Sequence, residues 1–398
     1  MAAGETVPEE DHMRFARRGG CWDVAVVGGG PAGAAAAARL ARGGARVVLL
    51  ERHPLPRSKV CGGGLVARAA GAVAVDVKPA AVEVCRRVEL TMGSRPLRFL
   101  AERPHAVIVM VDRGRLDHLL VRAAGRQGAE VRACCAVTGM RPAGDHVVLK
   151  TTRGLLRTRW VVCAEGAGGR LARMTGWAET RRLVPALECS LRLPAWRRRR
   201  FSRAAGFDFG ALPQGYGWRF PKAERLDVGV VGMQPRPGNL KRRLGLYLKR
   251  LGLADAPVYD LRAAPIPVAA RTDGFTRGRV LLVGDAAGLA DPLTAEGISH
   301  AVSSGRLAAD ALLEAGLDPG RAGALYHRRL RQEILGELGL ARFFARLVFR
   351  HPRAAERIFA LRGQHFVEGV TDIACGRRTY RSLLQNPLNY LRLLRPRP

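Results

Sequence analysis

The chain has 398 residues, of which 47% are hydrophobic and 25% charged, a composition typical of a folded protein with two or three structural units. No apolar run reaches the ~20 residues that a membrane-spanning helix needs. The eight cysteines include no CxxC pair, which argues against a zinc site or a disulfide framework, so we predict no bound metal.

The formal net charge is +32, which makes nucleic acid or an anionic membrane surface a candidate partner. Most of the basic residues are Arg, and they are spread along the chain apart from the run Arg197–Arg200. No nucleic-acid-binding motif is present, so we expect no nucleic acid partner and keep the anionic membrane surface as an option.

The first twenty residues contain four acids and no apolar stretch. Residues 1–20 are therefore predicted to be a disordered leader and not a signal peptide. We expect a cytoplasmic protein, with peripheral attachment to the inner face of a membrane as the option that the charge leaves open.

The stretch 22–51 has the pattern of one complete β–α–β unit. An apolar run at Trp22–Val27 precedes a glycine-rich turn and an alanine-rich helical segment, and a second apolar run follows at Ala45–Leu50. Glu51 ends that run, where a carboxylate accepts both hydroxyls of an adenosine ribose. Because a 2′-phosphate would be repelled there, the site is predicted to prefer FAD or NAD over NADP.

Three glycines in GxGxxG spacing join the first strand to the helix. Gly28 permits the tight turn, Gly30 lets the backbone approach a pyrophosphate, and Gly33 lets helix and strand pack closely. The helix begins at Pro31, and its free N–H groups favour the same anion. A lone GxGxxG also occurs in ordinary turns, but here both strands, the helix and the terminal acid indicate a nucleotide.

A loop rich in Pro and Gly follows and carries Cys61 before three consecutive glycines. Such a run brings backbone close to something flat or large, and a plain flexible loop is the alternative. For Cys61 itself, the alternative to a functional role is that of a small apolar side chain buried in the core. Strands are then predicted from alternating apolar residues at Val73–Val77, Val88–Thr91, Leu97–Leu100 and Val107–Val111.

An amphipathic helix is predicted at Arg115–Gln127, followed by strands at Glu130–Ala133, Val147–Thr151 and Trp160–Ala164. From 183 to 270, alternation with aromatic residues indicates an antiparallel sheet that has one face covered. A short basic helix is predicted at Leu240–Leu253. A strand at Arg279–Val283 then runs directly into GDAAG and a long helix at Ile298–Ala315, and the tail reads as helical.

Several motifs together give the chain a resemblance to a known family. They are GGGPAG at 28–33 with Glu51, DRGRLDHLL at 112–120, and GRVLLVGDAAGLADPLTAEGIS at 278–299. With these, the chain resembles FAD-dependent oxidoreductases of the aromatic-hydroxylase type. KVCGGG at 59–64 and Pro213-x-x-Tyr216-x-Trp218-x-Phe220-Pro221 make it similar to the geranylgeranyl reductase family, which saturates double bonds in isoprenoid chains.

The resemblance covers about residues 20–315 and implies an α/β fold. We expect a Rossmann-like FAD-binding domain, an inserted, mainly antiparallel β-sheet substrate domain, and a C-terminal helical region. The FAD-binding domain would comprise 21–182, with a small strand insertion at 72–111, and 271–318. The substrate domain would span 183–270 and the helical region 319–398. Two positions depart from the family pattern: Glu165 stands where Asp is usual, and Ala295 where Gly is common.

The resemblance also implies site residues. The positions expected to contact FAD are Gly28, Gly30, Pro31, Ala32, Gly33, Glu51, Arg52, Cys61, Gly62, Gly63, Arg115, Gly284, Asp285, Gly288, Gly297 and Ile298. Arg115 and Asp285 would contact the pyrophosphate and ribityl region, and Gly297 the flavin. Cys61, Tyr216 and Trp218 would be catalytic, with Cys61 beside the isoalloxazine and the other two lining a prenyl pocket.

Saturating an isolated alkene requires a hydride, which reduced flavin delivers from N5, and a proton at the other carbon. The predicted substrate is a prenylated lipid or prenyl diphosphate. Cys61 is the candidate acid, but a thiol with a pKa of about 8.5 is a poor one, so positioning the substrate is its alternative role, and Tyr216 is a weaker candidate. No second GxGxxG unit is present, so NADPH bound transiently or a ferredoxin-type electron donor would supply the electrons.

Two other functions fit parts of this pattern. An FAD-dependent monooxygenase that hydroxylates an apolar or aromatic substrate would use the same scaffold. A halogenase fits less well, because Tyr216 and Phe220 replace two positions of its Trp-x-Trp-x-Ile-Pro motif. A non-catalytic basic flavoprotein that binds RNA or an anionic membrane is favoured only by the net charge.

Overall fold

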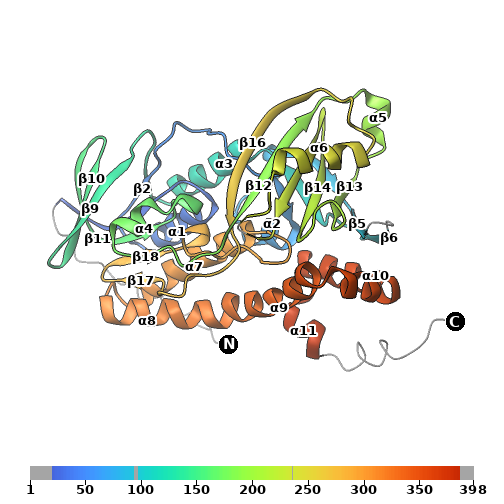
Figure 1. Ribbon diagram of the computed structural model, residues 1–398. Helices are drawn as coiled ribbons and strands as arrows, with labels where there is room; N and C mark the ends of the chain where they lie inside the picture. Colours follow the sequence, from blue (N-terminus) through green and yellow to red (C-terminus); the bar gives the residue numbers. More distant parts are fainter. Residues whose placement is uncertain (1–19, 94–96, 235, 386–398) are drawn as a thin grey trace, which may run out of the picture.

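The computed structural model describes residues 20–93, 97–234 and 236–385 (Figure 1). Apart from Gly20, the leader predicted at 1–20 lies outside the described residues, as do residues 386–398 of the predicted tail. No helix within the described ranges is long and apolar enough to cross a membrane.

The first β–α–β unit forms as predicted. It consists of β1 (Cys21–Val27), α1 (Pro31–Arg42) and β2 (Val47–Leu50). β1 lies between β2 and β11 (Gly154–Cys163) and pairs in parallel with both. Because helices or further chain cover both faces of a parallel sheet, β1 and β2 are continuous apolar runs, and nearly all of their residues are buried.

These strands form the centre of an eight-stranded sheet (left in Figure 1). Its other strands are β8 (Glu130–Arg132), β9 (Val137–Ala143), β10 (His146–Thr151), β17 (Thr276–Arg277) and β18 (Val280–Leu282). β8, β2, β1, β11 and β18 are parallel, whereas β10 pairs antiparallel with β11 and β9. Two helices, α3 (Arg113–Arg126) and α7 (Ile298–Glu314), pack on α1.

A seven-stranded sheet forms the second half of the molecule (right in Figure 1). Its strands, in spatial order, are β16 (Val258–Pro267), β12 (Leu183–Leu191), β15 (Arg225–Gly232), β14 (Gly215–Lys222), β13 (Ala204–Asp208), β5 (Arg87–Met92) and β6 (Leu97–Glu102). All neighbouring pairs are antiparallel except β13 with β5. The strands β5 and β6 therefore extend this sheet from a distant part of the chain.

Three short strands between β2 and α3 form a separate three-stranded sheet. It contains β3 (Gly64–Val66), β7 (Ile108–Val111) and β4 (Ala81–Cys85). The strand predicted at Val73–Val77 is wrong: α2 (Ala67–Ala72) ends there, a 3₁₀ turn η1 (Lys78–Ala80) follows, and the strand comes later, as β4. Alternating Val and Ala fit a partly buried bend as well as a strand.

Helices cover the two faces of the seven-stranded sheet. α6 (Leu240–Arg250) packs on one face, against β12 and β15. The other face shares a core with α9 (Gly336–Arg350), α10 (Pro352–Ala374) and α11 (Tyr380–Gln385). The preceding α8 (Pro319–Leu330) and the π-helical turn η4 (Arg331–Leu335) pack on the core of the first half, so that the helices from α8 to α11 run below both halves in Figure 1. Short helical turns occur at η2 (Gly166–Gly168), α4 (Arg170–Met174), α5 (Ala195–Arg199) and η3 (Gly284–Ala286).

Candidate active site

The turn between β1 and α1 is closed to side chains at two glycines. A Cβ on Gly33 would lie 2.0 Å from the Gly28 carbonyl oxygen, and a Cβ on Gly28, whose φ is +113°, would lie 2.4 Å from that of Ala164. At Gly30 the nearest atom that a Cβ would meet within the described chain is a guanidinium nitrogen of Arg57, at 3.6 Å. The open space beside Gly30 and the free N–H groups of α1 fit a pyrophosphate.

Glu51 is held in place from two sides. Its Oε2 accepts a hydrogen bond from the Gly29 N–H at 2.8 Å, and its Oε1 accepts one from the His53 N–H at 3.0 Å. Arg57 bridges the Oε2 atom of Glu51, at 3.3 Å, and the buried Asp117, at 3.0 Å. Glu51 is 4% exposed and follows the end of β2, where an adenosine ribose would lie. The adjacent Arg52 is exposed.

The DRGRLD segment opens α3 and presents a different arginine from the expected one. Asp112 caps the helix by accepting from the Arg115 N–H at 2.9 Å, and the Arg115 side chain is exposed. Arg113 is buried, pairs with Asp117 at 3.1 Å and lies against the Cys61 thiol. Burial opposes the charge of Arg113, but Asp117 and Cys61 outweigh it and raise the pKa. The pyrophosphate contact of Arg115 stays a prediction.

The glycine loop after Cys61 packs against β14. The Gly63 N–H donates to the Cys61 Sγ at 3.4 Å, and a Cβ on Gly63, at φ +74°, would lie 2.4 Å from the Val111 carbonyl oxygen. A Cβ on Gly62 would lie 2.9 Å from the Phe220 ring and 3.2 Å from the Trp218 Nε1. The flat groups that the glycines approach therefore include aromatic side chains of the chain itself.

Tyr216 and Trp218 point to the same side of β14, as their spacing predicts, and belong to the core shared with α9. Their ring centroids are 6.4 Å apart, and Tyr216 also packs on Phe209 and, through α9, on Phe349. The Tyr216 hydroxyl donates to the Thr294 carbonyl oxygen at 2.6 Å. Burial raises the pKa of Tyr216 well above its ordinary value, which makes its hydroxyl a poor acid.

The GDAAG turn brings cations around one carboxylate. Gly284 and Gly288 have φ values of +56° and +79°, and Asp285 stands between them. Burial raises the pKa of Asp285, and the positive charges of Lys59, Arg113 and Arg181 act against this rise. These positive charges favour an anionic cofactor beside the turn, and the Asp285 carboxylate is available to accept hydrogen bonds from it.

The N-terminus of α7 meets this turn. Gly297 caps the helix, and a Cβ there would lie 3.5 Å from the Asp285 Oδ1. Ile298 is buried behind it. The structure thus brings Asp285 and Gly297 together, and Arg113, which acts on both Asp285 and Cys61, connects them to the glycine loop.

Both departures from the family pattern have local explanations. Glu165 reaches forward to accept from the Leu171 N–H at 2.7 Å and so caps α4. Ala295 has a φ of +56°, a left-handed conformation that glycine adopts without steric cost.

Ala295→Gly is expected to raise the free energy of unfolding by about 1 kcal/mol, because it removes the Cβ that disfavours this conformation. Denaturant titration of the FAD-loaded protein measures the change. Ala38→Gly, a partly buried position inside α1, is the matched control and should lower stability by about 1 kcal/mol. Equal destabilisation by both substitutions would contradict the prediction.

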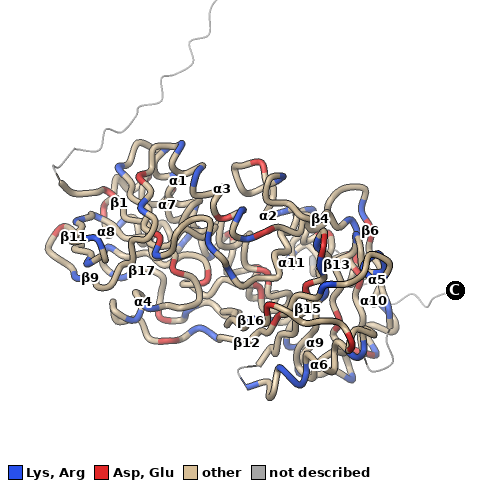
Figure 2. The backbone as a smooth tube through the Cα atoms, turned by 90° about the horizontal axis from the view of Figure 1, so that it is seen from above, with Lys and Arg blue, Asp and Glu red and all other residues tan. Residues whose placement is uncertain are grey.

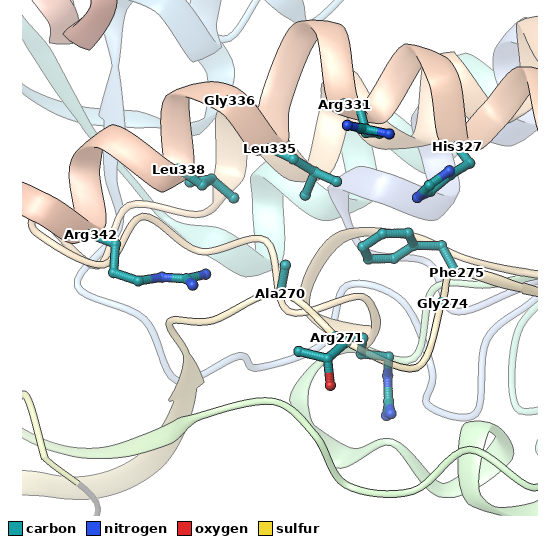
Figure 3. A pocket seen from close by; sticks show the side chains of 11 residues that line it. Ala270, Arg271, Gly274, Phe275, His327, Arg331, Leu335, Gly336, Leu338 and Arg342 are labelled. Atoms are coloured by element: carbon teal, nitrogen blue, oxygen red, sulfur yellow. The ribbon is translucent and has the colours of Figure 1, made fainter.

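A cavity of about 540 Å³ lies behind the site, between the loop 270–275 and the helices α8 and α9 (Figure 3). His327 and two arginines, Arg331 and Arg342, line it. The Arg271 guanidinium points away from these helices in Figure 3, and its Nε donates to the Ala286 carbonyl oxygen at 2.9 Å. The loop therefore separates the cavity from the GDAAG turn, and no site residue predicted from the sequence lines it within the described chain.

Comparisons with known proteins agree with this geometry. A family model described as FAD dependent oxidoreductase matches residues 23–156. Digeranylgeranylglycerophospholipid reductase 1 of Methanopyrus kandleri is 32% identical and covers 74% of this chain and 81% of its own. The chloroplastic geranylgeranyl diphosphate reductase of Oryza sativa is 31% identical over 73% of this chain, which spans 66% of that enzyme.

Solved structures share the fold over most of the chain. A geranylgeranyl bacteriochlorophyll reductase-like protein of Thermoplasma acidophilum superposes with a TM-score of 0.72 at 22% identity and covers 94% of this chain and 98% of its own. The halogenase PltM, solved in one variant with FAD, gives a TM-score of 0.69 at 16% identity over 90% of this chain and 84% of its own. These likenesses confirm the predicted fold class.

The fold, the glycine turn with its acid and the family match define an FAD-dependent oxidoreductase. Within this class, the two relatives above 30% identity identify the family. It belongs to the geranylgeranyl reductase family, as the sequence motifs indicate.

Proposed function

We propose that the protein is an FAD-dependent reductase that saturates C=C double bonds in the geranylgeranyl or polyprenyl chain of a lipid or diphosphate. The observation that carries this proposal is the aromatic wall of β14, where Trp218 and Phe220 border the Cys61 loop and Tyr216 packs toward α9. An apolar wall beside a cofactor site suits a prenyl chain, which has no polar group to recognise. The names of both relatives refer to geranylgeranyl compounds.

The residues present fit FAD. The space at Gly30 and the α1 N–H groups would hold the pyrophosphate and Glu51 the adenosine ribose, while Asp285 and Gly297 would hold the ribityl chain and the ring. Bound FAD, once reduced, supplies a hydride. In this proposal Cys61 positions the substrate, and Tyr216, tied to Thr294, serves as wall.

The electron donor is proposed to be external, either NADPH bound transiently or a ferredoxin-type carrier. The basic surface fits reduction at the cytoplasmic face of an anionic membrane, where a prenyl lipid would be found. Figure 2 shows Lys and Arg distributed along the molecule, so attraction would come from the whole surface and not from one element.

A second candidate function is monooxygenation of an apolar or aromatic substrate, which the shared fold with flavin-dependent halogenases favours. The two reactions leave different products. Reduction adds two hydrogens to each double bond, whereas hydroxylation adds one oxygen atom.

Mass spectrometry of prenyl lipids from a host with and without the protein is expected to show a gain of about two mass units, or multiples of it, in one lipid class, since each saturated bond takes up a hydride and a proton. Quinones, tetrapyrrole esters, phospholipids and diphosphates are extracted in parallel. A host that carries the Gly30→Ala variant is the control for cofactor dependence. A gain of about sixteen mass units would establish the monooxygenase instead.

A further inference from the structure

A carboxyl group stands on the substrate sheet in line with Trp218. Glu188 on β12 pairs in register with Gly229 on β15, which pairs with Trp218 on β14. A Cβ on Gly229 would lie 2.1 Å from the Trp218 Cζ2, so the indole lies flat over this glycine. Because the glycine leaves that space, the Trp218 Nε1–H reaches across β15 and donates to the Glu188 Oε2 at 3.3 Å.

The same indole nitrogen borders the cofactor loop. A Cβ on Gly62 would lie 3.2 Å from the Trp218 Nε1. Glu188 is therefore one side chain away from the Cys61–Gly64 loop, which borders the proposed flavin and substrate positions.

Glu188 and Asp227 are neighbouring carboxyl groups whose pKa values are shifted in opposite directions. Burial raises the pKa of Glu188 to about 7, and the negative charge of Asp227 contributes to this rise, while Lys222, Trp218 and Arg225 act against it. Asp227 has closer partners: the Lys222 Nζ lies 2.6 Å from its Oδ2, and the Ser190 hydroxyl donates to its Oδ1 at 2.7 Å.

Burial also acts against the charge of Asp227, but these partners together with Arg225 outweigh it and hold the pKa of Asp227 below its ordinary value. On β16, Arg262 pairs in register with Glu188 but directs its guanidinium to Asp260 and Ser58. Asp227 is thus the charged member of the pair, and Glu188 the member that keeps a proton near neutral pH. Such a split between neighbouring carboxyl groups assigns the acid of a site.

We propose that Glu188 is the acid that supplies the proton for double-bond reduction. This proposal rests on the proposed function. In the step, the Glu188 O–H bond breaks as a C–H bond forms at one alkene carbon, and the hydride from reduced flavin forms the C–H bond at the other. The step would leave the saturated bond, the flavin in its oxidised form and the Glu188 carboxylate, which takes up a proton (H⁺) from the solvent before the next turnover.

An acid with a pKa close to the working pH is suited to this task, because it is protonated when needed and still gives up its proton. Tyr216 does not meet this condition, since its hydroxyl is tied to Thr294 and its pKa is raised far above neutrality.

Glu188→Gln is expected to lower turnover by about 100-fold or more while FAD stays bound and is reduced at the wild-type rate. Wild-type turnover should fall by about tenfold per pH unit above pH 7, and the variant should lack this decline. Glu224→Gln, at an exposed turn between β14 and β15, is the matched control and should leave the turnover and its pH dependence unchanged. Glu188→Asp, which keeps the acid, should restore part of the activity.

A second readout does not depend on the substrate. Infrared difference spectra of the FAD-bound protein should show a protonated carboxylic acid band that disappears near pH 7 and is absent from Glu188→Gln but present in Glu224→Gln. If the wild type lacks this band at pH 6, or if Glu188→Gln reduces the lipid at the wild-type rate, the proposal is overturned. If the wild type reduces no prenyl lipid, the proposed function is overturned, and the Glu188 proton then has no alkene carbon as its acceptor.

Discussion

Gly30→Ala is expected to fold as the wild-type protein does and to bind FAD about 100-fold more weakly, a loss of about 2.7 kcal/mol. Within the described chain, a Cβ at this position meets only the Arg57 guanidinium at 3.6 Å, which is ordinary van der Waals contact with a flexible side chain. The steric conflict arises only when a pyrophosphate approaches the backbone. Titration of apoprotein with FAD, followed by the change in flavin fluorescence, measures the affinity.

Two other glycines provide the controls. Gly71 in α2 has open space around its Cα, so Gly71→Ala should leave FAD affinity unchanged. Gly33→Ala places a Cβ 2.0 Å from the Gly28 carbonyl oxygen and should destabilise the apoprotein itself. Wild-type affinity in Gly30→Ala would mean that the pyrophosphate lies elsewhere.

The nucleotide turn could be predicted because its constraints are local in sequence. Gly28 and Gly33 touch each other directly, and Glu51 follows one strand later, so spacing alone specifies their geometry. The bridge from Glu51 through Arg57 to Asp117 could not be predicted, since it joins side chains from a loop and a helix that hydrophobic periodicity does not place together.

Arg113 illustrates a limit within a recognised motif. Both Arg113 and Arg115 lie in DRGRLD, and the resemblance indicated the second. In α3 the first of them faces Asp117 one turn later and is buried, while the second faces outward. Helical spacing of Arg113 and Asp117 was the signal that could have identified it.

Strand pairing could not be derived from the sequence. Alternation indicated strands near 88–91 and 97–100, but it does not specify a partner, and β5 pairs with β13, more than a hundred residues later. Glu188 was missed for a related reason. A Glu in an alternating strand reads as solvent-facing, and it becomes partly buried only because Gly229, on another strand, lets Trp218 lie over the sheet.

Asp227→Asn is expected to lower the free energy of unfolding by about 3–5 kcal/mol, the cost of leaving a buried charge without its partner. Lys222 is 7% exposed and has its Nζ 2.6 Å from the Asp227 Oδ2, while Arg225 and Ser190 share the other oxygen. The neutral amide keeps the shape of the side chain but cannot balance these cations. Denaturant titration of both proteins with FAD bound measures the difference.

Asp255→Asn is the matched control, because Asp255 also pairs closely with an arginine, Arg197, but at the surface, where solvent screens the pair and the loss of stability should be much smaller. The effect of Asp227→Asn should also depend on pH in one direction. Since the folded state lowers the pKa of Asp227, its contribution is complete above the ordinary carboxyl pKa of about 4 and is lost as the pH falls through the lower folded value. Near pH 5, where Glu188 still holds its proton, the wild type should therefore exceed Asp227→Asn by the full amount, and the two should converge as the pH falls below about 4. A difference no larger than that of Asp255→Asn would mean that Lys222 finds water or another partner when Asp227 is neutral.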